Sequence, residues 1–184
     1  KTTKSRIDAT MDIARFPLAL ADAFMPDNLL TFKGHIDGSL HVGGEMSALT
    51  LDGHIDTDSM IVAAPLYNVN LRFPNTTLRA EHSLLRFDNV TAYAAGDTPM
   101  TLGGDVDFSQ LDNVSLNLRL QANDFQLINA PRTRNALMYG KMFVDLNAFA
   151  RGTLDNLKLR GSLKVLGKTD VSYVLEGSAI SSED

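Results

Sequence analysis

Four side chains in the first third of the chain have types and spacing suited to metal binding or acid–base chemistry. His35 and Asp37 alternate along one segment, and His54 and Asp56 alternate along the next. Imidazole and carboxylate groups that converge on one face can hold a zinc ion or move protons. Nothing in the sequence predicts a concave wall that would exclude water there. We therefore interpret the four as solvated cross-strand pairs and expect no metal and no catalytic residue.

The rest of the chain lacks the usual sequence signatures of enzymes and of nucleic-acid binding. Its 184 residues include no cysteine, which excludes a thiol nucleophile, a disulfide and a cysteine zinc site. Nucleophile-elbow, phosphate-loop, dinucleotide and zinc-protease motifs are also missing from the sequence. Lys and Arg number 17 against 22 Asp and Glu, a net charge of −5, and the basic residues are scattered. We predict that the protein is not an enzyme and has no cofactor and no nucleic-acid partner.

The strongest pattern along the chain is an alternation of apolar and polar residues with a period of two. Such alternation is typical of strands with one apolar face and one wet face. Turn-rich pairs, among them Gly43–Gly44, separate the alternating segments. The clearest segments are residues 34–42, 49–57, 116–120, 142–148 and 157–165. We predict roughly ten strands in a mostly antiparallel, all-β fold.

Two hairpins can be given a register in which apolar residues oppose each other and histidines oppose carboxylates. In the first, the expected pairs are Ile36–Ile55, Leu40–Leu51, Val42–Leu49, His35–Asp56 and Asp37–His54. In the second, near the C-terminal end, they are Val165–Val171, Leu163–Tyr173 and Arg160–Glu176. A slip of one residue would destroy both patterns.

One short helix is expected near the N-terminal end, over residues 17–25. Pro17 suits a first helical turn and Pro26 suits the stop. The segment between them is almost wholly apolar, so we expect it to pack against the sheet.

We expect residues 1–177 to form a single domain and residues 178–184 to be a flexible tail. No apolar run approaches the roughly 20 residues that span a bilayer. Because the chain begins at Lys1 rather than at Met, we interpret it as a fragment or a processed product.

The uncharged face of the predicted sheet admits several functions, and periodicity alone does not separate them. The sheet could curl without closing and leave a groove for acyl chains. It could close into a lipocalin-like barrel for a small apolar ligand, although the Gly-x-Trp motif of that family is impossible in a chain without Trp. It could also form the filled β-sandwich of a surface assembly. A hydrolase that uses the His–Asp face is the weakest alternative.

The C-terminal residues resemble the TamB family, and its Bacteroidetes members most closely. The resemblance rests on residues 139–145, on Gly152-Thr153-Leu154 and on residues 157–175. Near the other end, an apolar helix leads into Gly34-x-Ile36-x-Gly38-x-Leu40-x-Val42-Gly43-Gly44, which resembles the repeating unit of TamB and of the wider AsmA-like group. Residues 85–107 also fit that unit.

The resemblance implies a fold, a location and partners. TamB-like proteins are long periplasmic proteins, anchored in the inner membrane by an N-terminal helix that this sequence lacks. They act with an Omp85-class outer-membrane barrel (TamA or a BamA-like protein). They are implicated in outer-membrane protein assembly and in phospholipid transport between the membranes. Their repeats form an elongated curled sheet, the β-taco, around an apolar groove.

By alternation, the resemblance maps the groove wall onto apolar residues along the whole chain. They are Ile36, Leu40, Val42, Leu49, Leu51, Ile55, Val69, Leu71, Phe73, Val106, Phe108, Leu116, Leu118, Leu120, Met142, Val144, Leu146, Leu157, Leu159, Leu163 and Val165.

Overall fold

The structure is a computed structural model that describes residues 5–24, 29–153 and 155–175. The described residues form one antiparallel sheet of eleven strands with almost no helix, which confirms the all-β prediction. The expected tail at residues 178–184 lies outside the described residues.

The strands follow one another in the sheet almost in chain order. Their bounds are β1 Arg6–Pro17, β2 Thr31–Glu45, β3 Ala48–Ala64, β4 Val69–Arg72, β5 Thr77–Glu81, β6 Leu84–Ala92, β7 Met100–Asp107, β8 Ser115–Ala130, β9 Met138–Thr153, β10 Asn156–Val165 and β11 Asp170–Tyr173. The order across the sheet is β1-β2-β3-β5-β6-β7-β8-β9-β10, with β4 paired to β3 and β11 paired to β9. Consecutive antiparallel strands are the arrangement expected of short hairpin connections.

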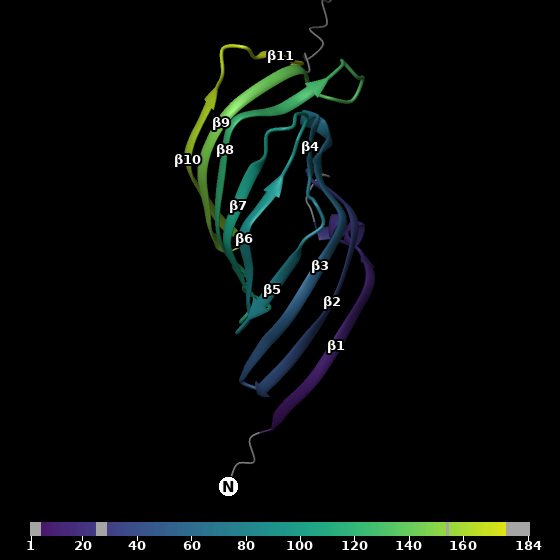
Figure 1. The fold of residues 1–184 in the computed structure, drawn as a ribbon, viewed down its shortest axis with the longest axis vertical. Helices are drawn as coiled ribbons and strands as arrows, with labels where there is room; N and C mark the ends of the chain where they lie inside the picture. The colour runs from purple at the N-terminus through teal and green to yellow at the C-terminus, as the bar shows by residue number, and fades with distance from the viewer. Residues whose placement is uncertain (1–4, 25–28, 154, 176–184) are drawn as a thin grey trace, which may run out of the picture.

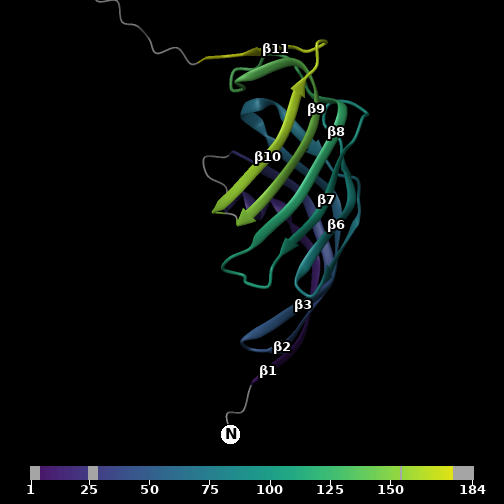
Figure 2. The ribbon, with the colours of Figure 1, turned by 90° about the vertical axis from the view of Figure 1, so that its left-hand side faces the viewer.

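The sheet is long and curled, with β1 and β10 as its two outer edges (Figures 1 and 2). Strands β1–β3 form one wall and strands β8–β10 the other, and β5 and β6 run between them. No pairing joins β1 to β10 among the described residues, so the sheet is not closed. This open sheet agrees with a β-taco and disfavours the lipocalin-like barrel.

The predicted register of the first hairpin is wrong by two residues. Glu45 pairs with Ala48 across a two-residue turn, and this turn fixes the register of the whole hairpin. Val42 therefore opposes Leu51 rather than Leu49, and Leu40 opposes Gly53. A shift of two residues keeps every side chain on its predicted face, so the apolar and wet faces survive the error.

The predicted C-terminal hairpin is also wrong. Strand β11 does not pair with β10; Val171 pairs with Gly140 and Tyr173 with Met138, both on β9. Strand β10 pairs with the far end of β9, from Val144 to Thr153. One long strand thus serves two short partners, a choice that alternation cannot reveal. Glu176, the expected partner of Arg160, lies outside the described residues.

The expected N-terminal helix is present as a short 3₁₀ helix, η1 (Leu18–Phe24). It packs against β2, and the Asp22 carboxylate accepts a hydrogen bond of 2.7 Å from the Phe32 backbone N–H. Leu20 remains exposed, so the helix is only partly covered. A second 3₁₀ turn, η3 (Pro65–Tyr67), links β3 to β4.

Glycines allow the strands to approach closely where the sheet curls. Gly104 in β7 has a φ of +114°, and a Cβ at this position would collide with the carbonyl oxygen of Asn117 on β8. Gly152 in β9 has a φ of +121° and would collide in the same way with Asn156 on β10. Residues other than glycine are strained at such angles, and glycine kinks of this kind are a known source of sheet curvature.

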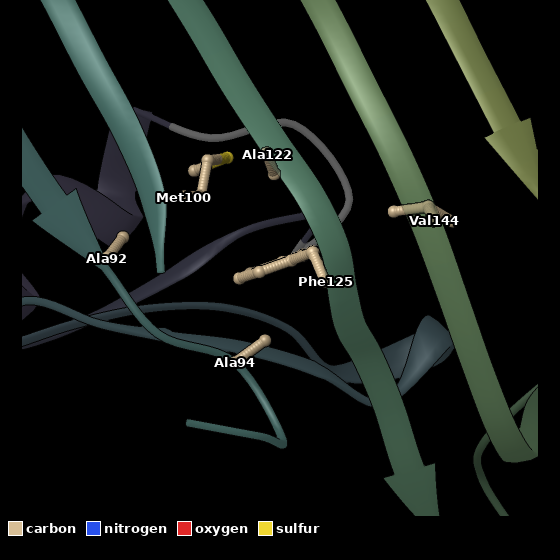
Figure 3. Close-up of a cluster of buried hydrophobic side chains, with 6 residues drawn as sticks. All are labelled: Ala92, Ala94, Met100, Ala122, Phe125 and Val144. Carbon is tan, nitrogen blue, oxygen red and sulfur yellow. The ribbon is translucent and has the colours of Figure 1, made fainter. Parts of the chain in front are cut away.

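The densest packing lies beside β4 and not along the whole sheet. Ala92, Ala94, Met100, Ala122, Phe125 and Val144 form a buried cluster there (Figure 3). Leu71 and Phe73, at the end of β4, pack against it together with side chains of β8 and β9. Phe125 and Val144 are each only 1% exposed. This cluster is the main hydrophobic core of the described residues.

We expect Gly104→Ala to lower the free energy of unfolding by about 1–3 kcal/mol, because alanine at this φ is strained and its Cβ collides with the neighbouring backbone. Gly167→Ala is the matched control, since no atom lies within 4 Å of an added Cβ at that turn. Urea unfolding of both variants measures the difference. Equal stability of the two would contradict the role of Gly104 in close strand approach.

Candidate functional site

Cross-strand pairing joins the apolar residues of successive strands into one continuous face. Side chains of directly opposed residues lie on the same side of a sheet. One row of such partners crosses nine strands without a charged residue: Met11, Leu40, Gly53, Ala80, Leu85, Val106, Leu116, Gly152 and Leu157. The concave side of the sheet is therefore apolar from one edge to the other.

The predicted wall residues differ widely in how far they are covered. Leu40, Val106 and Val144 are buried. Leu157, Leu159, Leu163 and Val165, all on the edge strand β10, are exposed. The remainder are partly buried: Ile36, Val42, Leu49, Leu51, Ile55, Val69, Leu71, Phe73, Phe108, Leu116, Leu118, Leu120, Met142 and Leu146.

In the half of the sheet nearest β4, the wall residues pack into the core. Leu71, Phe73, Leu120, Met142 and Leu146 all pack against the buried cluster that includes Val144. Their side chains fill space with one another, as in any protein interior. This half of the concave face is a packed core, and we call it the packed half.

The opposite half, between the β2–β3 hairpin and the β7–β8 loop (residues 108–114), keeps unfilled apolar space. A cavity of about 140 Å³ lies there, lined by Leu40, Leu51, Ile55, Ala80, Ser83, Leu85, Phe108 and Leu111. An apolar cavity of roughly this size is enough for a small hydrocarbon such as benzene. The only polar side chain in this lining, Ser83, uses its hydroxyl oxygen to accept a 3.0 Å hydrogen bond from the Leu51 backbone N–H. We call this region the open half.

The β7–β8 loop covers part of the open half. The Phe108 backbone N–H donates a 2.8 Å hydrogen bond to the Ser83 carbonyl oxygen, which attaches the loop to the turn between β5 and β6. Leu111 lines the cavity and is nevertheless 73% exposed. A second, larger depression of about 470 Å³ runs between this loop and the turn of the β2–β3 hairpin. The loop thus covers the cavity only in part.

A carboxylate anchors the start of this loop. Two hydrogen bonds from Ser109 hold the pKa of the Asp107 carboxylate below its ordinary value of 3.8. The Ser109 hydroxyl has the larger effect, and the Ser109 backbone N–H, which donates over 2.8 Å, has the smaller one. The charged form of Asp107 is therefore the one that the loop geometry stabilises.

Sequence reasoning missed several residues of the concave face. Leu78 and Ala80 in β5 are buried and alternate with polar residues, a signal that a shorter window would have found. Phe125 and Ile128 in β8 are buried too, but bulges on either side of Phe125 interrupt the period of two. Leu111 lies in a turn-rich loop where alternation carries no information.

The His–Asp face does not form the predicted pairs. In the observed register His54 opposes Ser39, Asp37 opposes Asp56, and His35 opposes Asp58. His54 Nε2 lies 3.6 Å from Asp56 Oδ2, and both side chains are about half exposed. No group of three or more His, Asp or Glu side chains among the described residues is placed to hold a metal ion.

Comparison with known proteins gives one decisive match. The family model of the TamB C-terminal domain matches residues 88–184, more than half of the chain. The chain belongs to the TamB family. Its Bacteroidetes type stays a prediction. No curated protein and no solved structure matches the chain.

Membership sets the broad role of this TamB segment. The TamB family is a transport and assembly module rather than an enzyme family, and it works in the cell envelope with outer-membrane assembly machinery. The match begins within β6, so β1–β5 lie outside it. The same row of apolar partners nevertheless continues from the matched strands into β2 and β3. Among the described residues, no helix has the length and apolar character needed to cross a membrane.

Val144 and Val165 offer a test of the packed half, because they oppose each other on one face but are 1% and 49% exposed. Val144→Asp places a carboxylate in the core and should lower the free energy of unfolding by more than about 3 kcal/mol. Val165→Asp should cost less than about 1 kcal/mol. Chemical denaturation compares the two, and a similar loss in both would mean that the core is not packed.

Ser109→Ala removes the stronger of the two hydrogen-bonding contributions to Asp107, so the pKa of Asp107 should rise toward 3.8. Because the folded pKa is lowered, the stability that it contributes is present above the unfolded pKa, and is lost as the pH falls through the folded pKa. Carboxyl-carbon NMR titration measures the change. Ser172→Ala, remote from this loop, is the control and should leave the Asp107 titration unchanged.

Proposed function

We propose that this TamB segment is part of a periplasmic bridge that carries phospholipid acyl chains along its apolar groove between the inner and outer membranes. In this role it also supports outer-membrane protein assembly, through an Omp85-class barrel such as TamA or a BamA-like protein. The full-length protein would be held in the inner membrane by an anchor outside this sequence. The groove wall consists of those apolar residues predicted above, between Ile36 and Val165, that lie outside the packed half.

The observation that carries the proposal is the uncharged concave face with unfilled apolar space in its open half. A purely structural sheet would bury such a face or cover it with polar groups, because exposed apolar surface is unfavourable in water. Here the wall stays partly exposed on β8, and its β10 residues are between 42% and 71% exposed. An acyl chain is the simplest partner for a long apolar face, since it needs no directional contact.

The size of the groove suits such a partner. The part of β3 that precedes the residues paired with β4, Ala48–Met60, has a length of about 40 Å. The acyl chains of one bilayer leaflet span only about 15 Å, half of the hydrocarbon core. Each methylene removed from water contributes about 0.8 kcal/mol, so even part of one chain would be held firmly.

The packed half limits where acyl chains can lie in this segment. Acyl chains would lie in the open half, between the β2–β3 hairpin and the lower part of β8, and would stop where the core begins. Because the core blocks the way, a lipid would leave the open half sideways, through the opening between the two edge strands β1 and β10. Transport along this segment would therefore proceed over its edges as well as along its length.

Leu118 on β8 provides the sharpest test, because it is partly buried on the concave face outside the packed cluster. It opposes Gly104 and Ala150, so no bulky cross-strand partner covers it. Leu118→Asp should lower phospholipid binding at least tenfold, because a carboxylate against an acyl chain loses its hydration. Gln121→Asp, on the opposite face of the same strand, is the matched control.

The measurement is the amount of phospholipid that co-purifies with the protein from a Gram-negative host, by lipid extraction and native mass spectrometry. Circular dichroism must show both variants folded. Lipid in the wild-type protein and in Gln121→Asp, with loss in Leu118→Asp, would support the groove. A lipid-free wild-type protein would contradict it and favour a segment that only bridges the membranes or docks the barrel.

A further inference from the structure

The two walls of the sheet carry opposite charges. Strands β1–β3 contain seven carboxylates against three Lys and Arg residues. Strands β8–β10 contain six Lys and Arg residues against two carboxylates. The chain as a whole is acidic, with a net charge of −5, so the positive charge of β8–β10 is opposite in sign to that of the whole chain.

Four of these basic residues gather around one aromatic ring on the outer face of β8–β10. The guanidinium carbons of Arg119 and Arg151 lie 5.3 Å and 5.2 Å from the centre of the Phe149 ring. Arg160 opposes Phe149 across the β9–β10 pairing, and Lys158 opposes Arg151. We call these four basic residues and Phe149 the basic patch.

No carboxylate of the described residues pairs with the charges of the basic patch. Among the described residues, the ion pairs involve none of its four basic side chains. Arg151 instead donates a 3.0 Å hydrogen bond from Nε to the neutral Asn117 side chain. Like charges that oppose each other directly, as Arg151 and Lys158 do, destabilise a sheet. An anion bound between them would remove this repulsion.

The patch also has a place for such an anion. A surface depression of about 240 Å³ is lined by Phe149, Arg151, Lys158 and Arg160. Stacking on Phe149 orients the Arg151 guanidinium, and guanidinium groups bind phosphate with two parallel hydrogen bonds. A phosphate is therefore the anion that best fits this chemistry.

Strand β10 connects the patch to the groove. It is an edge strand, so a ligand can pass around its free edge and contact both of its faces. Its outer face carries Lys158 and Arg160, while its concave face carries Leu157, Leu159 and Leu163, which are 42%, 71% and 57% exposed. A ligand that satisfies both faces must have an anionic head and an apolar tail.

We propose that the basic patch binds the phosphate of an anionic phospholipid whose acyl chains pass over β10 into the groove. The inference rests on the proposed function and adds to it a headgroup site and a preference for anionic lipid. The β10 edge is then the place where a lipid enters or leaves this segment.

The test uses native mass spectrometry of the purified protein with an equimolar mixture of phosphatidylglycerol and diacylglycerol that have identical acyl chains. The wild-type protein should retain several times more phosphatidylglycerol than diacylglycerol. The double variant Lys158→Gln/Arg160→Gln should lower this ratio about fivefold, since two exposed charge contacts of about 0.5 kcal/mol each are lost. Its diacylglycerol binding should not change. Lys33→Gln/Arg79→Gln, with the same loss of charge at exposed sites outside the patch, should keep the wild-type ratio.

The outcomes separate the two proposals. Absence of both lipids from the wild-type protein would overturn the groove and the headgroup site together. Equal retention of both lipids, or an unchanged ratio in Lys158→Gln/Arg160→Gln, would leave the groove standing and overturn the headgroup site. Excess inorganic phosphate should not displace the lipid, because phosphate has no acyl chain. Displacement by phosphate would identify a free-anion site and would also overturn the proposal.

Discussion

The register of the antiparallel ladder is the constraint on which the rest of this structure depends. Side chains alternate with a period of two, so a slip of one residue anywhere would carry the apolar set of that strand to the wet face. The observed pairings avoid this across nine strands. Bulges in β1, β3, β6 and β8 absorb the irregularities of the ladder. A continuous apolar face is thus a property of backbone pairing first and of side-chain packing second.

Packing then divides this face into two regions with different physics. Beside β4, Phe125 and Val144 are surrounded by apolar neighbours, and the sheet obtains its stability as an ordinary core does. Beyond the core, Leu118 and the β10 leucines retain access to solvent. A small sheet that left its whole concave side open would bury too little apolar surface to fold. The packed half supplies stability, while the open half keeps apolar side chains in contact with solvent.

Alternation was enough to predict the fold class and the two faces of the sheet. It could not predict which strands pair, because β9 accepts both β10 and β11 with equally apolar partners. It also failed at Phe125, where the bulges break the period. The basic patch escaped notice because Arg119, Arg151 and Lys158 are scattered in the sequence and meet only through pairing. The basic residues are scattered along the sequence, but strand pairing places them side by side on the folded sheet.

The opposite charges of the two walls lie on the outer faces of the sheet, where they act on an anion that approaches it. The acidic strands β1–β3 repel an anion and the basic strands β8–β10 attract it, and salt screens both effects over a distance of about 10 Å. An anionic lipid would therefore be steered toward the β10 edge, and this steering would weaken as the ionic strength rises.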